Sequence, residues 1–238
     1  MTSFALKIIA LVSMFCDHFG DAFVGHYSFL NLIGRIAFPI FAFQISEGFI
    51  HTKNLKEYFL RLGIFALIAQ IPFSLFIHKF LGGSYFSLNV FFTLLFGLFS
   101  IWIYDYLTNF VKKNEKWKDN TVIKNTVIAL SILIMLGIAY LAEVLDTDYG
   151  AWGVIVVFVF YLFKQDKLAM VISFITLCVI RYGTRLLAGF NMATLLLGIF
   201  TALSIVFICL YNGKQGKKIK YLLYVFYPVH LLLLYFIF

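Results

Sequence analysis

FNMATLLLGIFTALSIVFICLY, residues 190–211, carries no charged side chain and is long enough to cross a lipid bilayer as one helix. Apolar stretches of similar length recur along the whole chain. Of the 238 residues, 63% are hydrophobic and 13% are charged, and the mean hydropathy is +0.96. Because a soluble domain has about a quarter of its residues charged, these values predict a protein embedded in a membrane.

Nine spans are expected, because lipid-exposed backbone must be helical and a crossing needs roughly 17 to 25 residues. The expected spans are 4–20, 29–50, 57–78, 87–107, 122–142, 149–163, 168–185, 190–211 and 219–238. No long linker or internal repeat separates them. The expected fold is therefore an all-α, polytopic integral membrane helix bundle that forms a single domain over residues 1–238.

Basic residues predict the orientation, since Lys and Arg mark the cytoplasmic side of a membrane protein. With the amino terminus inside, the inner connections hold fifteen of the 19 basic residues. These are Lys7, Lys53, Lys56, Arg61, Lys112, Lys113, Lys116, Lys118, Lys124, Lys164, Lys167, Lys214, Lys217, Lys218 and Lys220. The outer connections hold Lys79, Arg181 and Arg185 and an acidic stretch at 143–148. The sequence thus predicts a multi-pass protein of the plasma or inner membrane with an outer carboxyl terminus, and its charge of +8 does not indicate nucleic-acid binding.

The first apolar run leads into Asp17 and His18 rather than into a cleavage site, so we expect it to be a retained span and not a signal peptide. Cys16, Cys178 and Cys209 lie in expected spans without paired spacing. We therefore expect inert thiols, neither a disulfide framework nor a zinc site, and no bound metal.

Ionisable residues inside spans are functional candidates, because each charge there costs about 2.5–3.5 kcal/mol on insertion scales. His18 lies at the outer part of the first span. Asp17 is about 100° away around the helix and cannot orient the His18 ring, whereas Asp21 can approach it. Two interpretations stay open: both groups are wetted by lipid headgroups, or His18 is a general base, as its unperturbed pKa of about 6.5 would suit.

Arg35 lies in the second span at a depth similar to His18 and must find a carboxylate, a carbonyl or water. A structural ion pair with Asp17 or Asp21 and a catalytic or ligand-binding role are both open. Pro39 removes a backbone donor in the same span and either only kinks the helix or opens room for water or ligand.

Glu47 belongs to the inner half of the second span, where Lys53 or Arg61 is expected to neutralise it. Residues 54–57, NLKE, resemble a capping box that starts the third span. Lys53, Lys56 and Arg61 then gather at a helix start, which favours an anion such as phosphate. A plain inner-side charge signal explains the same three residues.

His230 follows Pro228 near the middle of the last span. A satisfied hydrogen bond between helices and a role in the site are both open for it. The histidines His26, His51 and His78 fall in expected loops and carry little functional signal.

Short motifs recur in a fixed order over nearly the whole chain. They are LKIIA (6–10), DHFG (17–20), GRIAFPIFAF (34–43), EGF (47–49), QIPF (70–73), LNVF (88–91) and YPVHL (227–231), with Thr52, Asn54, Tyr58, Arg61 and Leu62. In this order they resemble the TraX family, membrane proteins associated with conjugation whose named activity is acetylation of the pilin amino terminus. The layout is more remotely similar to acyltransferase family 3, in which a first-span His acts with arginines and a late Tyr-x-x-His segment follows. That likeness implies His18, Arg35 and Arg61 as functional positions and a cytoplasmic acyl-CoA donor.

These resemblances imply a membrane-embedded O- or N-acetyltransferase that uses acetyl-CoA as its donor. The CoA phosphates are expected against Lys53, Lys56 and Arg61. Glu47 and Asn89 are expected to align the donor.

The expected catalytic residues are Asp17, His18 and Arg35. His18 would remove the acceptor proton, and Arg35 would stabilise the oxyanion of the tetrahedral intermediate. Asp21, Tyr227 and His230 are expected on the acceptor side. The expected partners are acetyl-CoA, membrane lipid and an acceptor that is a protein, a peptide or a glycan.

Two other classes stay open. Intramembrane Asp, Arg, Glu and His also mark the proton relays of a proton-coupled transporter, although no inverted repeat is visible. A non-catalytic assembly factor for a conjugation or secretion apparatus fits the same residues.

Overall fold

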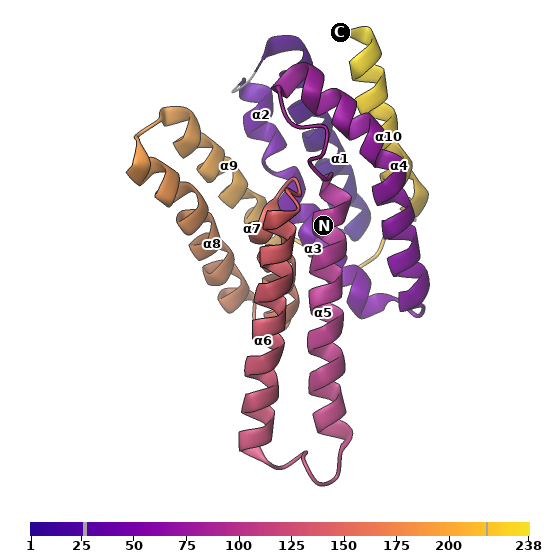
Figure 1. Cartoon of the computed structure of the whole chain (residues 1–238), viewed down its shortest axis with the longest axis vertical. Coiled ribbons are helices and arrows are strands. Elements are labelled where there is room, and N and C mark those ends of the chain that lie inside the picture. Colours follow the sequence, from indigo (N-terminus) through magenta and orange to yellow (C-terminus); the bar gives the residue numbers. More distant parts are fainter. Residues whose placement is uncertain (26–27, 218) are drawn as a thin grey trace.

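The computed structural model describes residues 1–25, 28–217 and 219–238, and within these ranges the chain is helical almost throughout (Figure 1). Over the same ranges the strand-type contacts amount to an isolated bridge between Leu88 and Thr147. The predicted all-α class is confirmed. His26, predicted in a loop, and Lys218, predicted in an inner connection, lie outside the described residues.

The helices follow one another with short connections. Their bounds are α1 Ser3–Phe19, the π-helical turn η1 Gly20–Val24, α2 Phe29–Gly34, α3 Ala37–His51, α4 Leu55–Leu81, α5 Val90–Lys113, α6 Thr121–Val144, α7 Gly150–Leu162, α8 Lys167–Ala188, α9 Met192–Cys209 and α10 Lys220–Ile237. Each of the nine expected spans coincides with one helix or, for the first two, with a pair of consecutive helices.

Seven segments of the described chain are long and apolar enough to cross a membrane. They are Ser3–Val24, Phe29–His51, Leu55–Leu81, Val90–Lys113, Thr121–Val144, Lys167–Ala188 and Met192–Cys209. The sixth and ninth expected spans correspond to shorter apolar helices, Gly150–Leu162 and Tyr221–Ile237. The helices therefore make this a multi-pass membrane protein, in which seven described segments are candidate crossings by length and composition.

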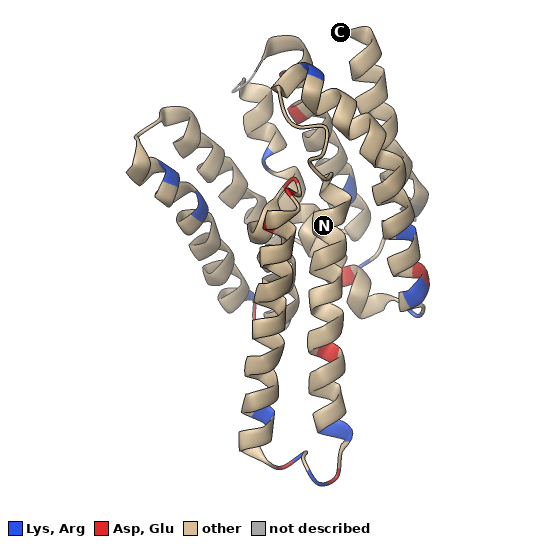
Figure 2. Ribbon diagram, viewed as in Figure 1, with Lys and Arg blue, Asp and Glu red and all other residues tan. Residues whose placement is uncertain are grey.

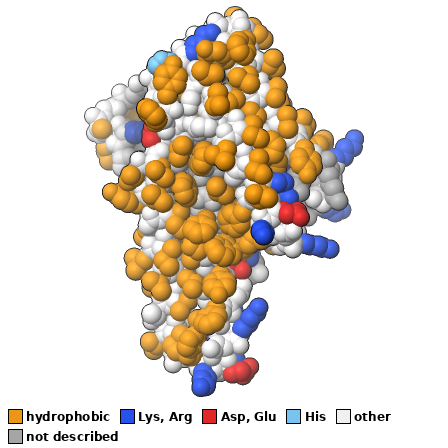
Figure 3. Space-filling model, turned by 45° about the vertical axis from the view of Figure 1, so that its right-hand side comes forward, with side chains coloured by type: hydrophobic (Ala, Val, Ile, Leu, Met, Phe, Trp, Pro, Cys, Tyr) orange, Lys and Arg blue, Asp and Glu red, His pale blue; other side chains and the backbone are white. Residues whose placement is uncertain are grey.

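The surface of the bundle is apolar. Leu187, Phe86 and Phe236 are 91%, 88% and 78% exposed, and hydrophobic side chains cover most of the face drawn in Figure 3. A water-soluble protein rarely exposes a contiguous apolar area of this extent, whereas lipid tails solvate it without cost.

The connections lie at two ends of the bundle. The α3–α4 and α5–α6 connections lie toward the lower end in Figure 1, and the α1–α2 turn and the carboxyl terminus lie at the upper end. The α5–α6 hairpin extends beyond the other helices, and basic side chains gather near its tip and around the α3–α4 connection (Figure 2).

The α3–α4 connection shows half of the predicted capping box. Asn54 Oδ1 accepts a hydrogen bond from the backbone N–H of Glu57 at 3.1 Å. Glu57 does not reach back, because its carboxylate pairs with Arg61 one turn along α4 at 3.3 Å. The Asn54 N–H donates to Thr52 Oγ1 instead. The cap still places Arg61 in the second turn of α4, as predicted.

The second expected span is two helices, α2 and α3, joined through Arg35 and Ile36. Pro39 explains the break, because its ring excludes the carbonyl of the residue four positions earlier, which is Arg35. Pro39 itself falls in the first turn of α3, where a missing N–H leaves no hydrogen bond unmade. Pro72 and Pro228 instead lie inside α4 and α10, which continue through them.

The α6–α7 connection, expected as an acidic connection on the outer side of the membrane, packs against the core through Thr147 and Tyr149. Thr147 is buried and pairs with Leu88, whose N–H donates to the Asp146 carbonyl at 2.9 Å. The Tyr149 ring stacks on Phe38 of α3 with 3.7 Å between ring centroids. The sequence interpretation missed this because a short acidic loop has the same composition whether it lies on the surface or folds inward.

Asn89 links α4 to α5 from a fully buried position. Its Oδ1 caps α5 by accepting from the Phe91 N–H, while its Nδ2 donates to the Ala66 carbonyl at 2.8 Å and to Gln70 Oε1 at 2.9 Å. These contacts use both ends of the amide. Asn89 is thus held in a structural network between helices.

We expect Asn89→Ala to lower the free energy of unfolding by about 2–4 kcal/mol, because it removes a helix cap and leaves buried amide and carbonyl groups unpaired. Asn191→Ala is the matched control, since Asn191 caps α9 from an exposed position and holds no other helix; it should cost about 1 kcal/mol. Denaturant titration in mixed micelles measures both. Equal losses would contradict the interhelical role of Asn89.

Candidate functional site

Asp17 and Arg35 form an ion pair that joins α1 to the α2–α3 break. Arg35 Nη2 lies 2.6 Å from both carboxylate oxygens of Asp17. The Arg35 side chain is 27% exposed and that of Asp17 is 11% exposed. Arg35 Nε donates to the Asn31 carbonyl at 3.3 Å, and within the described chain Nη1 makes no hydrogen bond. Of the two predicted partners, Asp17 holds Arg35.

Asn31 organises the same cluster. Its Oδ1 accepts from the N–H and the hydroxyl of Ser28, which forms the capping box of α2. Its Nδ2 therefore points away and donates to Asp17 Oδ1 at 3.1 Å and to Asp21 Oδ1 at 2.8 Å. Asp21 lies with Asn31 and not, as the helical spacing suggested, against His18.

Gly34 allows α2 to approach Asp17 closely. A Cβ atom added at Gly34 would lie 2.3 Å from Asp17 Cβ. Any larger residue would push α2 away from α1 and separate Arg35 from its carboxylate. The packing thus explains why a glycine directly precedes Arg35 in the motif at 34–43: a larger side chain would not fit against Asp17.

His18 and His230 form a hydrogen-bonded pair between α1 and α10, with 2.7 Å from His18 Nδ1 to His230 Nε2. His230 Nδ1 lies 2.7 Å from the Phe226 carbonyl, which can only accept. His230 must therefore carry its proton on Nδ1, and its Nε2 accepts from His18 Nδ1–H. In the neutral pair, His18 Nε2 then keeps a free lone pair, as a general base requires.

A cavity of about 580 Å³ opens between α1, α3, α4, α5 and α10. Its mouth is formed by exposed residues, among them His51 and Lys217, and its deep end by Val90, Phe91 and Tyr227, which are at least 91% buried. The Tyr227 ring centroid lies 6.1 Å from that of His18 and 5.8 Å from that of His230. The deep end of the cavity therefore borders the histidine pair.

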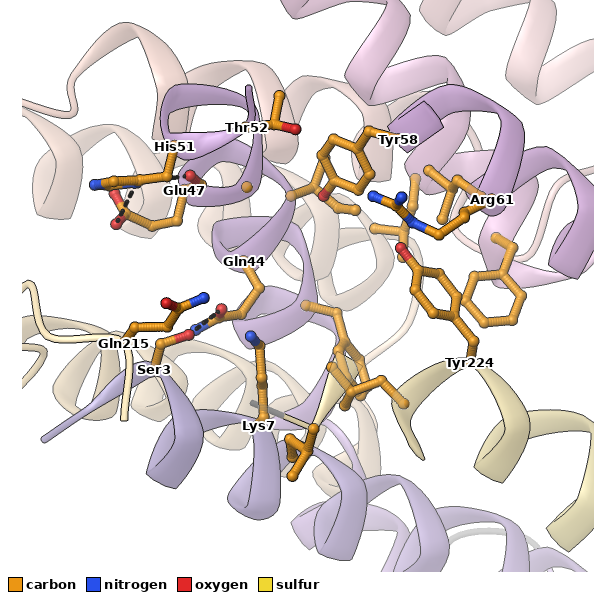
Figure 4. Close-up of a pocket in the computed structure, with 18 of the residues that line it drawn as sticks. Ser3, Lys7, Gln44, Glu47, His51, Thr52, Tyr58, Arg61, Gln215 and Tyr224 are labelled. Atoms are coloured by element: carbon orange, nitrogen blue, oxygen red, sulfur yellow. Dashed lines mark hydrogen bonds and ion pairs between the residues drawn. The ribbon is translucent and has the colours of Figure 1, made fainter. Parts of the chain in front are cut away.

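Several donors line this cavity without a protein acceptor (Figure 4). Arg61 Nε and Gln44 Nε2 are buried and unpaired within the described chain, and the Tyr227 hydroxyl makes no hydrogen bond of normal geometry. In Figure 4 the Lys7 side chain also points into the space. An excess of donors of this kind suits an anionic ligand that brings its own acceptors.

The acidic side of the cavity is Glu47. Its carboxylate lies 3.7 Å from the His51 ring. Partial burial and the adjacent Glu47 carboxylate raise the pKa of Tyr211 to about 12, so the Tyr211 hydroxyl stays protonated and donates to Glu47. Neither expected partner, Lys53 or Arg61, pairs with Glu47. The reason is local: Arg61 already pairs with Glu57 on its own helix.

The predicted site residues thus fall into separate groups. Asp17, Asp21 and Arg35 share the ion-pair cluster, and His18, Tyr227 and His230 share the histidine pair at the deep end. Glu47 and Arg61 line the cavity. Three predicted donor-binding residues do not line it: Lys53 and Lys56, which are exposed, and Asn89, which is buried between α4 and α5.

The sequence interpretation missed Asn31, Lys7 and Asp148 as site residues. In the sequence, Asn31 is indistinguishable from an ordinary helix-capping residue, and Lys7 was interpreted only as a charge on the inner side of the membrane. The Asp148 side chain reaches the surface, but the surrounding protein removes water from its carboxyl group and raises its pKa to about 6. The positive charge of Arg35 acts to lower the same pKa. No spacing in the sequence relates Asp148 to Arg35, because the α6–α7 connection reaches it only through packing.

Metal-ligand geometry is absent from the described residues, since no three His, Cys, Asp or Glu side chains there are grouped to hold an ion. Cys16, Cys178 and Cys209 are free thiols.

Comparison with known proteins gives a family match and one relative. A family model described as "TraX protein" matches residues 3–238. A protein of Dichelobacter nodosus, described as "Probable fimbrial assembly protein FimC, serogroup H1", is 29% identical over 253 residues, covering 98% of this chain and 94% of that protein. No solved structure matches.

We expect Asp17→Ala and Arg35→Ala to be strongly coupled in a double-mutant cycle, with an interaction energy of about 1–3 kcal/mol in the free energy of unfolding. Either single change leaves the other charge half-buried and unpaired. The control cycle uses Glu115 and Lys118, an exposed ion pair at 2.7 Å, which should couple by about 1 kcal/mol or less. Additive losses at Asp17 and Arg35 would show that the pair does not hold α1 to α2.

Proposed function

Because the chain belongs to the TraX family, we propose that it transfers an acetyl group from cytoplasmic acetyl-CoA to an acceptor at the membrane. By family resemblance the acceptor is the amino terminus of a pilin-type protein. The observation that carries the proposal is the donor-rich cavity whose deep end borders the His18–His230 pair.

The cavity suits the donor in both chemistry and shape. CoA is highly anionic, and Lys7, Arg61 and Lys217 line the part of the cavity that its phosphates would occupy. Lys53 directly follows Thr52, which also lines the cavity, so exposed lysines of this connection extend the positive charge outward. The apolar deep end, including Met14 and Phe91, would receive the pantetheine arm and the acetyl group.

The histidine pair supplies the proton chemistry. The acceptor nitrogen attacks the thioester carbonyl carbon, and His18 Nε2 takes the proton that the nitrogen loses. The tetrahedral intermediate then collapses, the carbon–sulfur bond breaks, and His18 returns the proton to the departing thiolate of CoA. The Phe226 carbonyl and His230 fix the tautomer of His18, so that its lone pair is on Nε2 before the reaction and again after it.

Charge develops on the carbonyl oxygen during this attack, and we assign two donors to it, Arg35 Nη1 and the Tyr227 hydroxyl. Arg35 Nη1 is not used by the contacts to Asp17 and Asn31. The buried Tyr227 hydroxyl is a second donor without a normal hydrogen bond of its own. Donors fixed before the reaction stabilise an oxyanion best where water is excluded.

The proposed topology places the amino terminus in the cytoplasm, with the shorter helices α7 and α10 as additional crossings that bring the total to nine. The support is the charge distribution: the α3–α4, α5–α6, α7–α8 and α9–α10 connections hold most of the basic residues. The cavity mouth, near His51 and Lys217, then faces the cytoplasm, where acetyl-CoA is available. The membrane is accordingly the plasma or inner membrane.

A non-catalytic assembly role is the second candidate, favoured by the similarity to the Dichelobacter nodosus protein described as a probable fimbrial assembly protein. An assembly factor needs no donor site. Binding of acetyl-CoA therefore separates the two candidates.

We expect His18→Gln to abolish transfer, with a loss of about 10²–10⁴-fold in rate, while acetyl-CoA binding is retained. The measurement is mass spectrometry of membrane proteins and glycans for the increment of an acetyl group, together with binding of radiolabelled acetyl-CoA to purified protein. His78→Gln is the control, because His78 is exposed and its ring stacks on Tyr85 instead of contacting the histidine pair. Normal acetylation by the His18 variant would exclude it as the base.

We expect Arg61→Gln to weaken acetyl-CoA binding about 10- to 100-fold, because a charged donor to phosphate contributes about 1.5–3 kcal/mol. Lys79→Gln, which removes a cation bonded to the Tyr235 carbonyl, should leave binding unchanged. Equilibrium binding of radiolabelled acetyl-CoA measures both. Equal affinity in the Arg61 variant would place the donor elsewhere, and no binding by the unaltered protein would favour the assembly role.

A further inference from the structure

A second cavity, of about 650 Å³, lies between the inner halves of α5 and α6 and the α7–α8 turn. It shares no lining residue with the cavity described above. Its walls are more polar, and they come from three separate parts of the chain. Neither the family resemblance nor the proposed reaction assigns it a role.

Positive charge dominates this second cavity. Lys112 comes from α5, Lys118 from the hairpin loop, Lys124 from α6 and Lys164 from the α7–α8 turn. Segments far apart in sequence therefore bring four ammonium groups to one space. Mutual repulsion makes such a grouping costly unless an anion is bound there or water screens it.

The two carboxylates that line the cavity are already engaged. Asp105 accepts from the Tyr161 hydroxyl at 2.6 Å and from Asn109 Nδ2 at 2.9 Å. Asp166 caps α8 by accepting from the Ala169 N–H at 3.0 Å. Neither makes an ion pair with a cavity lysine in the described chain.

Of the four lysines, Lys118 pairs with Glu115 at 2.7 Å. Lys164 lies 4.1 Å from the centre of the Tyr161 ring, a cation–π contact that leaves its N–H donors available. Lys112 and Lys124 have no ion-pair partner among the described residues. The cavity therefore presents three ammonium groups that an anionic group could engage.

The surroundings of the cavity are apolar, which indicates the source of the anion. Tyr106, Phe110, Val122 and Leu130 on the two helices of the hairpin are all about half exposed or more. Large apolar side chains at this exposure need hydrocarbon around them. A phospholipid would place its phosphate at the lysines and its acyl chains along these helices.

We propose that this cavity binds the headgroup of an anionic phospholipid in the inner leaflet. Three ammonium groups without an ion-pair partner in the described chain line the cavity, and the two phosphates of a diphosphatidylglycerol headgroup can engage them. Basic pockets between helices on the cytoplasmic side are suited to such headgroups. The site would anchor the α5–α6 hairpin, which extends beyond the other helices (Figure 1), to the membrane surface.

The test compares lipid binding by the unaltered protein and three triple variants, using native mass spectrometry with tetraoleoyl cardiolipin. Lys112→Gln/Lys124→Gln/Lys164→Gln should weaken binding roughly a hundredfold, since each lysine contributes about fivefold. The corresponding Lys→Arg variant keeps the charge and should retain binding, which separates the loss of charge from misfolding.

The control variant is Lys113→Gln/Lys116→Gln/Lys167→Gln, which removes three exposed neighbouring lysines that do not line the cavity. It should weaken binding severalfold at most. Equal weakening in both glutamine variants would mean general surface attraction and would overturn the site. Displacement of cardiolipin by inorganic phosphate at millimolar concentration would assign the cavity to a soluble phosphate and would overturn the lipid proposal.

Discussion

Hydrocarbon offers no hydrogen-bond partner, and every polar group inside a span must therefore be met by another part of the protein. This constraint positions the helices of the bundle. The Asp17–Arg35 pair holds α1 to the α2–α3 break, the His18–His230 pair holds α1 to α10, and Asn89 holds α5 to α4. Lipid tails are as apolar as leucine, so hydrophobic burial alone does not bring these helices together.

The same constraint explains why the functional candidates lie at structural joints. Arg35 occupies the place where Pro39 interrupts the second span, and its Nε donates to the Asn31 carbonyl in the turn before the interruption. Gly34 lets Asp17 come close enough to complete the pair. A polar cluster of this kind holds the helices together, and it also places charged groups where a ligand can bind them.

The two cavities differ in what they leave unpaired. In the cavity between α1, α3, α4, α5 and α10, donors such as Arg61 Nε face space that ends at Tyr227, beside the histidine pair. In the second cavity the excess is ammonium charge at the membrane surface. One therefore fits a substrate that reaches into the bundle, and the other fits a headgroup that stays at its edge.

Apolar stretches and basic connections could be interpreted directly, because helix length and charge placement in a bilayer depend on local composition. The positions of the helices, the breaking effect of Pro39 and the candidate status of Asp17, His18, Arg35 and His230 followed from that. The ion pair of Arg35 with Asp17 was one of the alternatives that the sequence left open, and the pairing of the two histidines was not foreseen. Nothing in the sequence relates His18 to His230, since this pair joins segments far apart in the chain.

The sequence by itself determined that this is a helical membrane protein, where its helices lie and which buried polar residues need an explanation. Only the tertiary structure decided which of these residues meet, that Asn89 is held between α4 and α5, and that Lys7 and Arg61 face a common cavity while Lys53 and Lys56 do not. The physical reason is that the bilayer acts on every segment separately, through composition, whereas hydrogen bonds and cavities depend on the rotation and depth of each helix relative to its neighbours.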